Sequence, residues 1–531
     1  MRAAKDNTVQ TLPDDVEALK AIIANQDNII ALKQQRILQL EEFLLLSRAK
    51  KFGASTEKSP DQHEMFNEAE LSVAAEEVLV EQEAQREAVS PESKTKNKPG
   101  RKPLPVELPR IRIEYDLADT EKRCACGCER TVIGEQTSEQ LDIIPAKVQV
   151  LVHVRKKYAC KQCEEGVKTA PLSPQPIPKS NASPGTLAYI TTAKYVDGVP
   201  LHRQEAGLNR SGIDIPRNTL ANWMMRCGEL IEPLIHRLEE RLLNYPVIQC
   251  DETVVQVLNE PDKPPESHSY MWVRNGGPPT EPIRLFHYAN SRKAEVAARL
   301  FEGYQGYLQS DDYAGYNRVA AQPGITHLGC WAHARRKFID AQKATAKSKS
   351  KKTGKADMAV SLIAKLYAIE NRIKHLSVEA KQTIRQQEAV PILNKIRAWL
   401  DKTLHSTLPK GMLGKALGYL DKNWHKLIVY TQDGRLSIDN NGAENALRPF
   451  VIGRKNWLFS ASVRGAKSSA NLYSLIETAK ASGQEPYAYL CHVFKELPKA
   501  KCIDDIERLL PWHVDRQTSS NDVGETQDGG D

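Results

Sequence analysis

The sequence lacks long hydrophobic runs. Of its 531 residues, 40% are hydrophobic, yet no stretch approaches the roughly 20 consecutive apolar residues that a transmembrane helix needs. Residues 1–6 (MRAAKD) lead into polar sequence and not into the apolar segment of a secretory signal peptide. We therefore expect a cytoplasmic protein with no membrane segment.

Cysteine is also scarce, since ten cysteines in a chain of 531 residues are too few for a disulfide-stabilised scaffold. Half of them fall in two clusters, at 124–128 and 160–163. Two thiolate pairs supply four ligands for a tetrahedral Zn²⁺, which stabilises a module too small for a core of its own. A redox pair is the alternative, but nothing resembling a thioredoxin unit surrounds it. The predicted zinc ligands are Cys124, Cys126, Cys160 and Cys163, with Cys128 as a substitute in the first pair.

A P-loop and a G-x-G-x-x-G motif are both absent, so nucleotide hydrolysis lacks its phosphate cradle. Charge is nearly balanced, with 74 Lys and Arg against 67 Asp and Glu, a formal net charge of +7. This small excess is compatible with a polyanionic partner and does not establish one. The length predicts about three or four structural units.

Apolar residues recur every seven positions near the N-terminus, which predicts one long helix. The first seam holds Val16, Ile23, Ile30, Ile37 and Leu44, and the poorer second seam holds Leu19, Gln26, Lys33, Leu40 and Ser47. One interpretation is a parallel coiled coil that joins two chains, and the alternative is a helix that packs on the rest of its own chain.

Changes in composition and periodicity predict a multidomain α/β protein. Strand-like segments such as 148–154 flank the cysteine clusters, and 201–223 suits either a helix-turn-helix or a plain helical bundle. The expected order is a leucine-zipper-like helix (1–52), a linker (53–105), a zinc module (106–170), a helical and DNA-binding region (178–245), the first part of a catalytic α/β domain (246–336), a helical insertion (337–432), the second part of that domain (433–482), and a C-terminal segment with a polar tail (483–531).

Two carboxylates occupy unusual positions in the α/β domain. Asp251 lies inside an apolar strand and Asp311 at the end of another, where charge is costly unless it is paired or bound to a metal. Neighbouring strands bring such acids close enough to repel each other unless cations lie between them. A third acid is expected from a helix, and Glu444 follows the N-cap residues 439–441, while Glu477 is the runner-up.

Each acid alone would be an ordinary salt bridge or helix cap. Three acids on a strand, a strand and a helix of one domain favour two Mg²⁺ ions, which stabilise the attacking and leaving oxygens of a phosphoryl transfer. Cations near these acids would receive DNA phosphates. The predicted DNA contacts are Arg335, Arg336, Arg448, Arg454 and Lys455.

Several motifs together make the chain resemble the transposases of the IS66 insertion-sequence family. They lie at 100–105, 138–142, 157–160, 251–253, 308–311, 329–335, 439–444, 453–459 and 472–478. The resemblance implies an RNase H-like DDE catalytic domain in which Asp251, Asp311 and Glu444 bind the catalytic metals, preceded by a leucine zipper and a zinc finger.

The sequence departs from the family pattern at two places. Arg123 stands where the first zinc cysteine is usual, so Cys124 is expected to substitute, and Asp312 stands where the family often has glycine, which makes it a false lead beside Asp311. The family also has a Cys-x-x-His pair, here Cys330 and His333. A packed cysteine with a hydrogen-bonded histidine is favoured over a zinc site there.

The predicted function is a bacterial, nucleoid-associated transposase that binds the inverted-repeat ends of its element and cleaves and transfers DNA strands. Its expected partners are double-stranded DNA, a second copy of itself through the N-terminal helix, and small accessory proteins of the element. Two alternatives stay open: an RNase H-fold nuclease that cuts without joining, and a catalytically dead, zinc-dependent DNA-binding repressor.

Overall fold

The computed structural model describes residues 148–158, 168–345 and 354–515, together with 15–17, 19–20, 23–27, 29–30 and 33. The chain divides into two compact units, one formed by 78–173 and the other by 1–77 with 174–531. The predicted linker, both cysteine clusters with their zinc ligands, and the tail beyond 515 lie outside the described residues.

The N-terminal region is helical, since every described residue from Val16 to Lys33 is in a helix. Val16, Ile23 and Ile30 of the first predicted seam are exposed. The second half of the seam lies outside the described residues.

The described part of the smaller unit is a short antiparallel pair, β1 (Lys157–Tyr158) with β2 (Lys168–Thr169). The strand predicted over 148–154 is wrong, because none of those residues is in a strand. Val150 and Val152 are 88% and 80% exposed. Alternating hydrophobicity makes a strand only where a neighbour pairs with its backbone, and pairing among the described residues starts at Lys157.

Four helices precede the large sheet: α3 (Pro184–Tyr195), α4 (Leu201–Arg210), α5 (Arg217–Leu230) and α6 (Glu232–Leu243). Residues 196–200 and 211–216 separate α3, α4 and α5. Gly198 and Gly212 adopt φ of 69° and 77°, a left-handed conformation that favours glycine.

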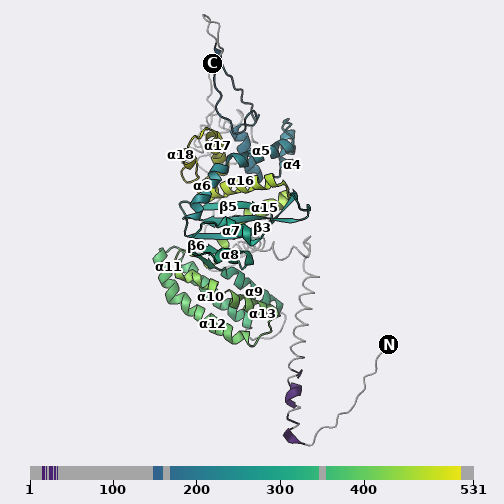
Figure 1. The fold of residues 1–531 in the computed structure, drawn as a ribbon, viewed down its shortest axis with the longest axis vertical. Helices are drawn as coiled ribbons and strands as arrows, with labels where there is room; N and C mark the ends of the chain where they lie inside the picture. The colour runs from purple at the N-terminus through teal and green to yellow at the C-terminus, as the bar shows by residue number, and fades with distance from the viewer. Residues whose placement is uncertain are drawn as a thin grey trace, which may run out of the picture. The chain divides into compact units, whose positions relative to one another are not determined.

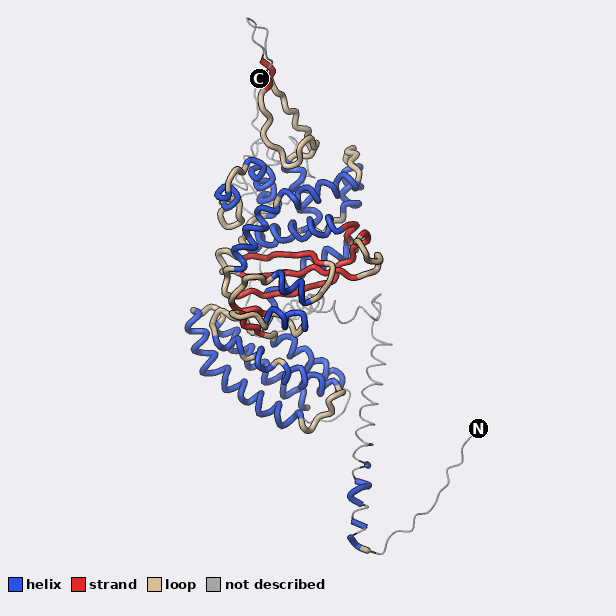
Figure 2. Tube along the Cα trace, in the orientation of Figure 1, coloured by secondary structure: helices blue, strands red, loops and turns tan. Residues whose placement is uncertain are grey.

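A mixed sheet forms the centre of the larger unit, and Figure 2 shows its strands between layers of helix. Five strands run in the order β5-β4-β3-β6-β7, and a sixth, β8, pairs with the far end of β3. β4 and β5 are antiparallel to their neighbours, whereas β6, β7 and β8 are parallel to theirs. The strands are β3 (Val247–Asn259), β4 (His268–Gly276), β5 (Ile283–Ala289), β6 (Gly306–Gln309), β7 (Ile325–Leu328) and β8 (Ser460–Ser462). The predicted mixed α/β class is confirmed.

Long helices from the C-terminal part of the chain cover one face of this sheet (Figure 1). Ser474 accepts a 2.7 Å hydrogen bond from the Phe286 backbone N–H, which fixes α16 on the edge strand β5. The helices on this face are α15 (Asn441–Trp457) and α16 (Val463–Ala481). The chain continues in α17 (Pro486–Glu496), a 3₁₀ turn at Leu497–Lys499 and the short α18 (Ile503–Glu507), where α17 packs on α3 and α16, and α18 on α6. Shorter elements link the strands: α7 (Ala294–Leu300), a 3₁₀ turn (Ala314–Tyr316) and α8 (Asn317–Ala320).

A group of helices between β7 and α15 has a separate hydrophobic core around Trp331, Phe338, Leu366 and Leu400. They gather beside the β6 and β7 side of the sheet in Figure 1. The elements are α9 (Trp331–Thr345), α10 (Lys355–Ile373), α11 (Val378–Ile384), a π-helical turn (Arg385–Ala389), α12 (Val390–Leu404), α13 (Met412–Lys422), α14 (Trp424–Leu427) and a 3₁₀ turn (Val429–Gln432).

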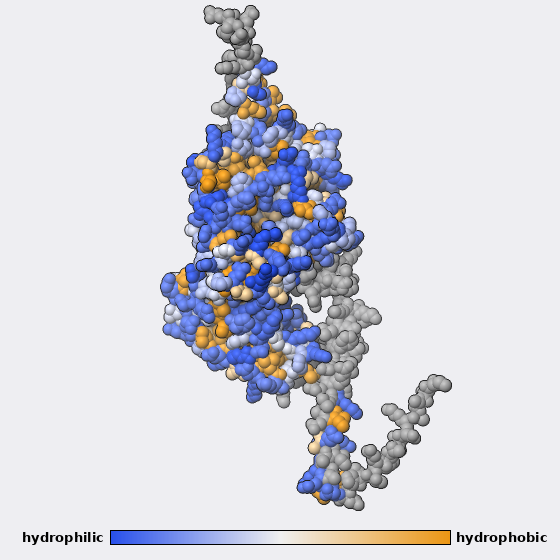
Figure 3. All heavy atoms as spheres, viewed as in Figure 1, coloured by the Kyte–Doolittle hydropathy of each residue, from blue (hydrophilic) through white to orange (hydrophobic). Residues whose placement is uncertain are grey.

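The described surface drawn in Figure 3 is mainly hydrophilic, with small scattered hydrophobic patches. Within the described ranges, no helix is both long enough and apolar enough to cross a membrane.

Candidate functional site

The two predicted aspartates lie in β3 and just beyond the end of the adjacent parallel strand β6. Gln249 of β3 lies opposite Gln309 of β6 in the strand register, and the Gln249 side chain donates a 2.8 Å hydrogen bond to that of Gln309. Asp251 and Asp311 each follow their glutamine by two residues. The paired glutamines therefore fix the two backbones just before both aspartates.

The side chain of Asp251 belongs to the face of the sheet that α15 covers. Gln249 donates to the carbonyl of Asp439 at 3.3 Å, just before α15, and Thr253 accepts a 3.1 Å hydrogen bond from Arg454 within α15. Side chains along a strand alternate between the two faces, so Asp251, between these two residues, shares their face.

Glu444 lies in the first turn of α15, as predicted, and is 3% exposed. Asn440 is the N-cap residue of α15, as predicted, but its side chain makes no capping hydrogen bond. Its amide donates instead to the Cys250 carbonyl at 3.0 Å. This bond ties the start of α15 to the strand residue next to Asp251, so the elements that carry all three predicted acids meet.

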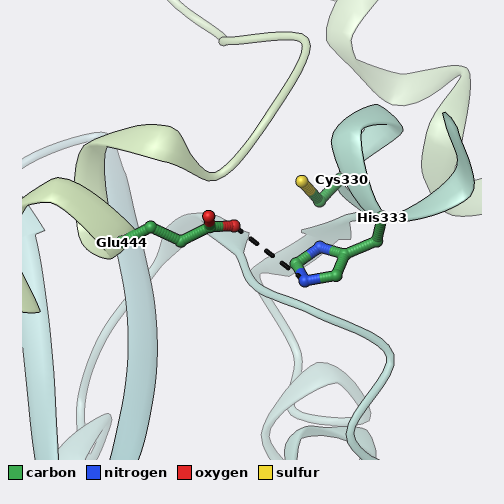
Figure 4. A group of neighbouring side chains, drawn as sticks. All are labelled: Cys330, His333 and Glu444. Carbon is green, nitrogen blue, oxygen red and sulfur yellow. Dashed lines mark ion pairs between the residues drawn. The ribbon is translucent and has the colours of Figure 1, made fainter. Parts of the chain in front are cut away.

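The side chains of the three acids nevertheless have different immediate partners. Asp311 accepts a 3.0 Å hydrogen bond from the Tyr313 N–H and lies 3.7 Å from Arg292 Nη2. Glu444 Oε1 lies 3.9 Å from His333 Nε2. Among the described residues, one group of Cys, His and acidic side chains has potential ligand atoms that all lie within 4.8 Å of one another. It consists of Cys330, His333 and Glu444 (Figure 4), and neither Asp251 nor Asp311 belongs to it.

Asp312 and Glu477, the competing acids, both form ordinary ion pairs. Asp312 lies 2.9 Å from Lys422 Nζ, in the helical insertion. Glu477 lies 2.9 Å from Lys480 and 3.6 Å from Arg284 of the edge strand β5. Neither acid therefore needs a metal to balance its charge.

Sequence reasoning missed a buried acid on the opposite face of β3. The carboxylate of Glu252 accepts hydrogen bonds from Arg292 and from the Tyr316 hydroxyl. Burial, and then the nearby charge of Asp311, raise its pKa to about 7. Arg292 also stacks 3.7 Å from the centre of the Tyr313 ring. Alternation along the strand indicates that Glu252 and Asp251 face opposite ways, but no local pattern links Glu252 to Arg292.

The predicted DNA-contacting cations differ in exposure. Arg335 and Lys455 are exposed, and Arg336 and Arg448 are half-buried. Arg454 is only 9% exposed, and its guanidinium donates to Thr253 Oγ1 and to the Val254 carbonyl. Arg454 thus fastens α15 to β3.

Comparison with known families covers most of the chain. A model described as "Transposase IS66 family" matches residues 179–468, and the "IS66 C-terminal element" matches 474–512. The "zinc-finger binding domain of transposase IS66" matches 121–164, and "Transposase C of IS166 homeodomain" matches 39–113. The zinc-finger match includes both cysteine clusters.

Two curated relatives come from Sinorhizobium fredii. The uncharacterized protein y4jD is 32% identical over 425 residues, which cover 77% of this chain and 81% of the relative. The uncharacterized protein y4qI is 30% identical over 541 residues, with 95% and 98% covered. No solved structure matches the chain.

Proposed function

Because the chain belongs to the IS66 family of transposases, we propose that it binds the terminal inverted repeats of an insertion sequence and catalyses Mg²⁺-dependent cleavage and transfer of DNA strands. The observation that carries this proposal is the meeting of β3, β6 and α15. Asp251 lies in β3, Asp311 follows the end of β6 by two residues, and Glu444 lies in α15. The order and directions of the strands support an RNase H-like domain around these acids.

The donor set fits the proposed metal. Asp251, Asp311 and Glu444 offer only carboxylate oxygens, the ligands that Mg²⁺ prefers, and these three residues would hold two ions. When bound, such ions supply charge stabilisation for the attacking and leaving oxygens of an in-line phosphoryl transfer.

Other side chains of the site would position the three acids. The Gln249–Gln309 hydrogen bond holds the two strands in register, and Asn440 holds the start of α15 against β3. Arg292, 3.7 Å from Asp311, orients that carboxylate and offsets its charge. Arg335, Arg336, Arg448 and Lys455 would bring DNA phosphates toward the acidic centre, and the zinc finger would support binding to the ends.

Neighbouring aspartates provide a matched test. We expect Asp311→Asn, like Asp251→Asn and Glu444→Gln, to bind DNA that carries the ends of the element but to lose Mg²⁺-dependent nicking. The loss should exceed the roughly 100-fold cost of removing a residue that merely supports a metal ligand. Asp312→Asn should keep nicking, because Asp312 pairs with Lys422. Wild-type nicking by Asp311→Asn would refute the assigned triad.

Strand transfer separates the transposase from its two alternatives. With pre-cleaved ends and Mg²⁺, a transposase joins the free 3′-hydroxyl to target DNA, a nuclease only cuts, and a repressor only binds. Joined products that depend on Asp251 support the proposal, and metal-dependent cutting with no joined product contradicts it.

A further inference from the structure

We propose that Cys330, His333 and Glu444 form a second metal site, selective for a thiophilic divalent cation such as Zn²⁺ and distinct from the proposed Mg²⁺ site. The effect of this second site on catalysis rests on the proposed function, because Glu444 would belong to both sites. Metal binding itself does not depend on that function.

The geometry places three donors around one small space. Cys330 immediately precedes α9, His333 lies in its first turn, and Glu444 faces them from α15 (Figure 4). Their potential ligand atoms lie within 4.8 Å of one another. Ligand atoms of a tetrahedral Zn²⁺ are roughly 3–4 Å apart, given bonds of about 2.0–2.3 Å. Small side-chain rotations would therefore close the site, and a water molecule would complete it.

The backbone holds the two protein segments of this site together. The Trp331 N–H donates to the Ile438 carbonyl at 3.1 Å, and the Asn440 N–H donates to Cys330 Sγ at 3.2 Å. The second bond holds the Cys330 sulfur at the start of α15, on the side from which Glu444 approaches.

The chemistry of the donors selects the kind of metal. Thiolate and imidazole suit Zn²⁺, whereas Mg²⁺ takes oxygen ligands. Cys330, His333 and Glu444 are 0%, 8% and 3% exposed, so a metal bound between them would be shielded from solvent. Zinc bound here would draw the Glu444 carboxylate toward α9 and away from Asp251 and Asp311. We therefore expect Zn²⁺ to inhibit the Mg²⁺-dependent reaction.

Zinc content of the full chain tests the site without any DNA reaction. After equilibration with Zn²⁺ and removal of the unbound metal, Cys330→Ser and His333→Gln should each hold one equivalent less than the wild type. Cys491→Ser, which changes a half-buried cysteine of α17, should hold as much as the wild type. Wild-type zinc content in both Cys330→Ser and His333→Gln would overturn the proposal.

Anomalous scattering at the zinc edge tests the unmodified protein, so a variant that folds poorly does not affect the result. Crystals grown with Zn²⁺ should show a peak between Cys330, His333 and Glu444. A peak at the zinc finger with none at this position would overturn the second site. Neither measurement depends on strand cleavage. A missing zinc peak would therefore refute the second metal site but not the transposase proposal, which the Asp311→Asn variant tests. Wild-type nicking by Asp311→Asn would refute the assigned triad but would not change the zinc content.

Discussion

At the scale of single residues, Arg292 is the cation that pairs with the buried carboxylate of Glu252, which also accepts a hydrogen bond from Tyr316. The Glu252 side chain is 1% exposed and that of Arg292 is 23% exposed. Without Arg292, the buried Glu252 carboxyl must either keep its charge without this counter-ion or take up a proton, which its raised pKa already favours, and either state costs stability. We therefore expect Arg292→Gln to lower the free energy of unfolding by about 3 kcal/mol, measured by denaturant unfolding.

Two further variants show whether that loss comes from the stranded charge. Adding Glu252→Gln to Arg292→Gln should recover part of the stability, because it removes the unpaired carboxylate. Arg318→Gln should change little, since the Arg318 and Glu295 side chains are 59% and 65% exposed and exposed pairs contribute little. Equal losses from Arg292→Gln and Arg318→Gln would contradict this account.

Residue-level prediction from the sequence succeeded where the local pattern determines position. An acid inside an apolar strand and an acid just after N-cap residues located Asp251 and Glu444 on the expected elements. The roles of Arg292 and Arg454 depend on contacts with residues 40 and about 200 positions away. Periodicity carries no information on such contacts, so Arg454 was indistinguishable from Lys455 as a DNA contact.

At the scale of elements, variants of Arg454 and Lys455 test which contacts fasten α15 to β3. Arg454→Met removes the hydrogen bonds to Thr253 and Val254 in β3, and we expect a loss of roughly 2 kcal/mol of stability. Lys455→Met removes the same charge from an exposed position, so stability should stay unchanged while DNA binding weakens and depends less on salt. Thermal unfolding and DNA titrations at two salt concentrations measure both effects.

The two variants should thus separate stability from binding. If Lys455→Met unfolded as early as Arg454→Met, the anchoring role of Arg454 would be wrong. If Lys455→Met bound DNA as tightly as the wild type at every salt concentration, Lys455 would not be a phosphate contact.

Strands and helices were predictable where their apolar residues pack against other elements of the fold. β3, β4, β5, β6 and α7 all form within 246–336, the part of the chain predicted as the first half of the α/β domain, because their apolar residues pack in one core. The segment 148–154 has the same alternation but stays exposed and unpaired among the described residues. The strand order was not predictable, since pairing of β3 with β6 joins residues 60 positions apart.

At the scale of the whole molecule, the helices inserted between β7 and α15 pack around their own core and also touch the candidate site. Trp331 Nε1 donates to the Leu427 carbonyl at 2.8 Å, and Lys422 pairs with Asp312 next to Asp311. The first helix of this group also supplies Cys330 and His333 at its start. The insertion therefore borders the predicted acids, so a shift of its helices would move side chains that lie next to Asp311 and Glu444.

We expect two chains to associate through the N-terminal helix. Val16, Ile23 and Ile30 are 63%, 56% and 51% exposed, and a seven-residue apolar seam is buried when a second helix covers it. Burial of one isoleucine side chain contributes roughly 1.5–3 kcal/mol, and a dimer buries it twice. Ile23→Asp should therefore raise the dissociation constant of the full chain by more than about 100-fold, measured by sedimentation over a range of concentrations. Asn25→Asp adds the same charge outside both seams and should sediment as the wild type. A wild-type chain that stays monomeric at high concentration, or an Ile23→Asp chain that dimerises equally well, would show that the seam does not join two chains.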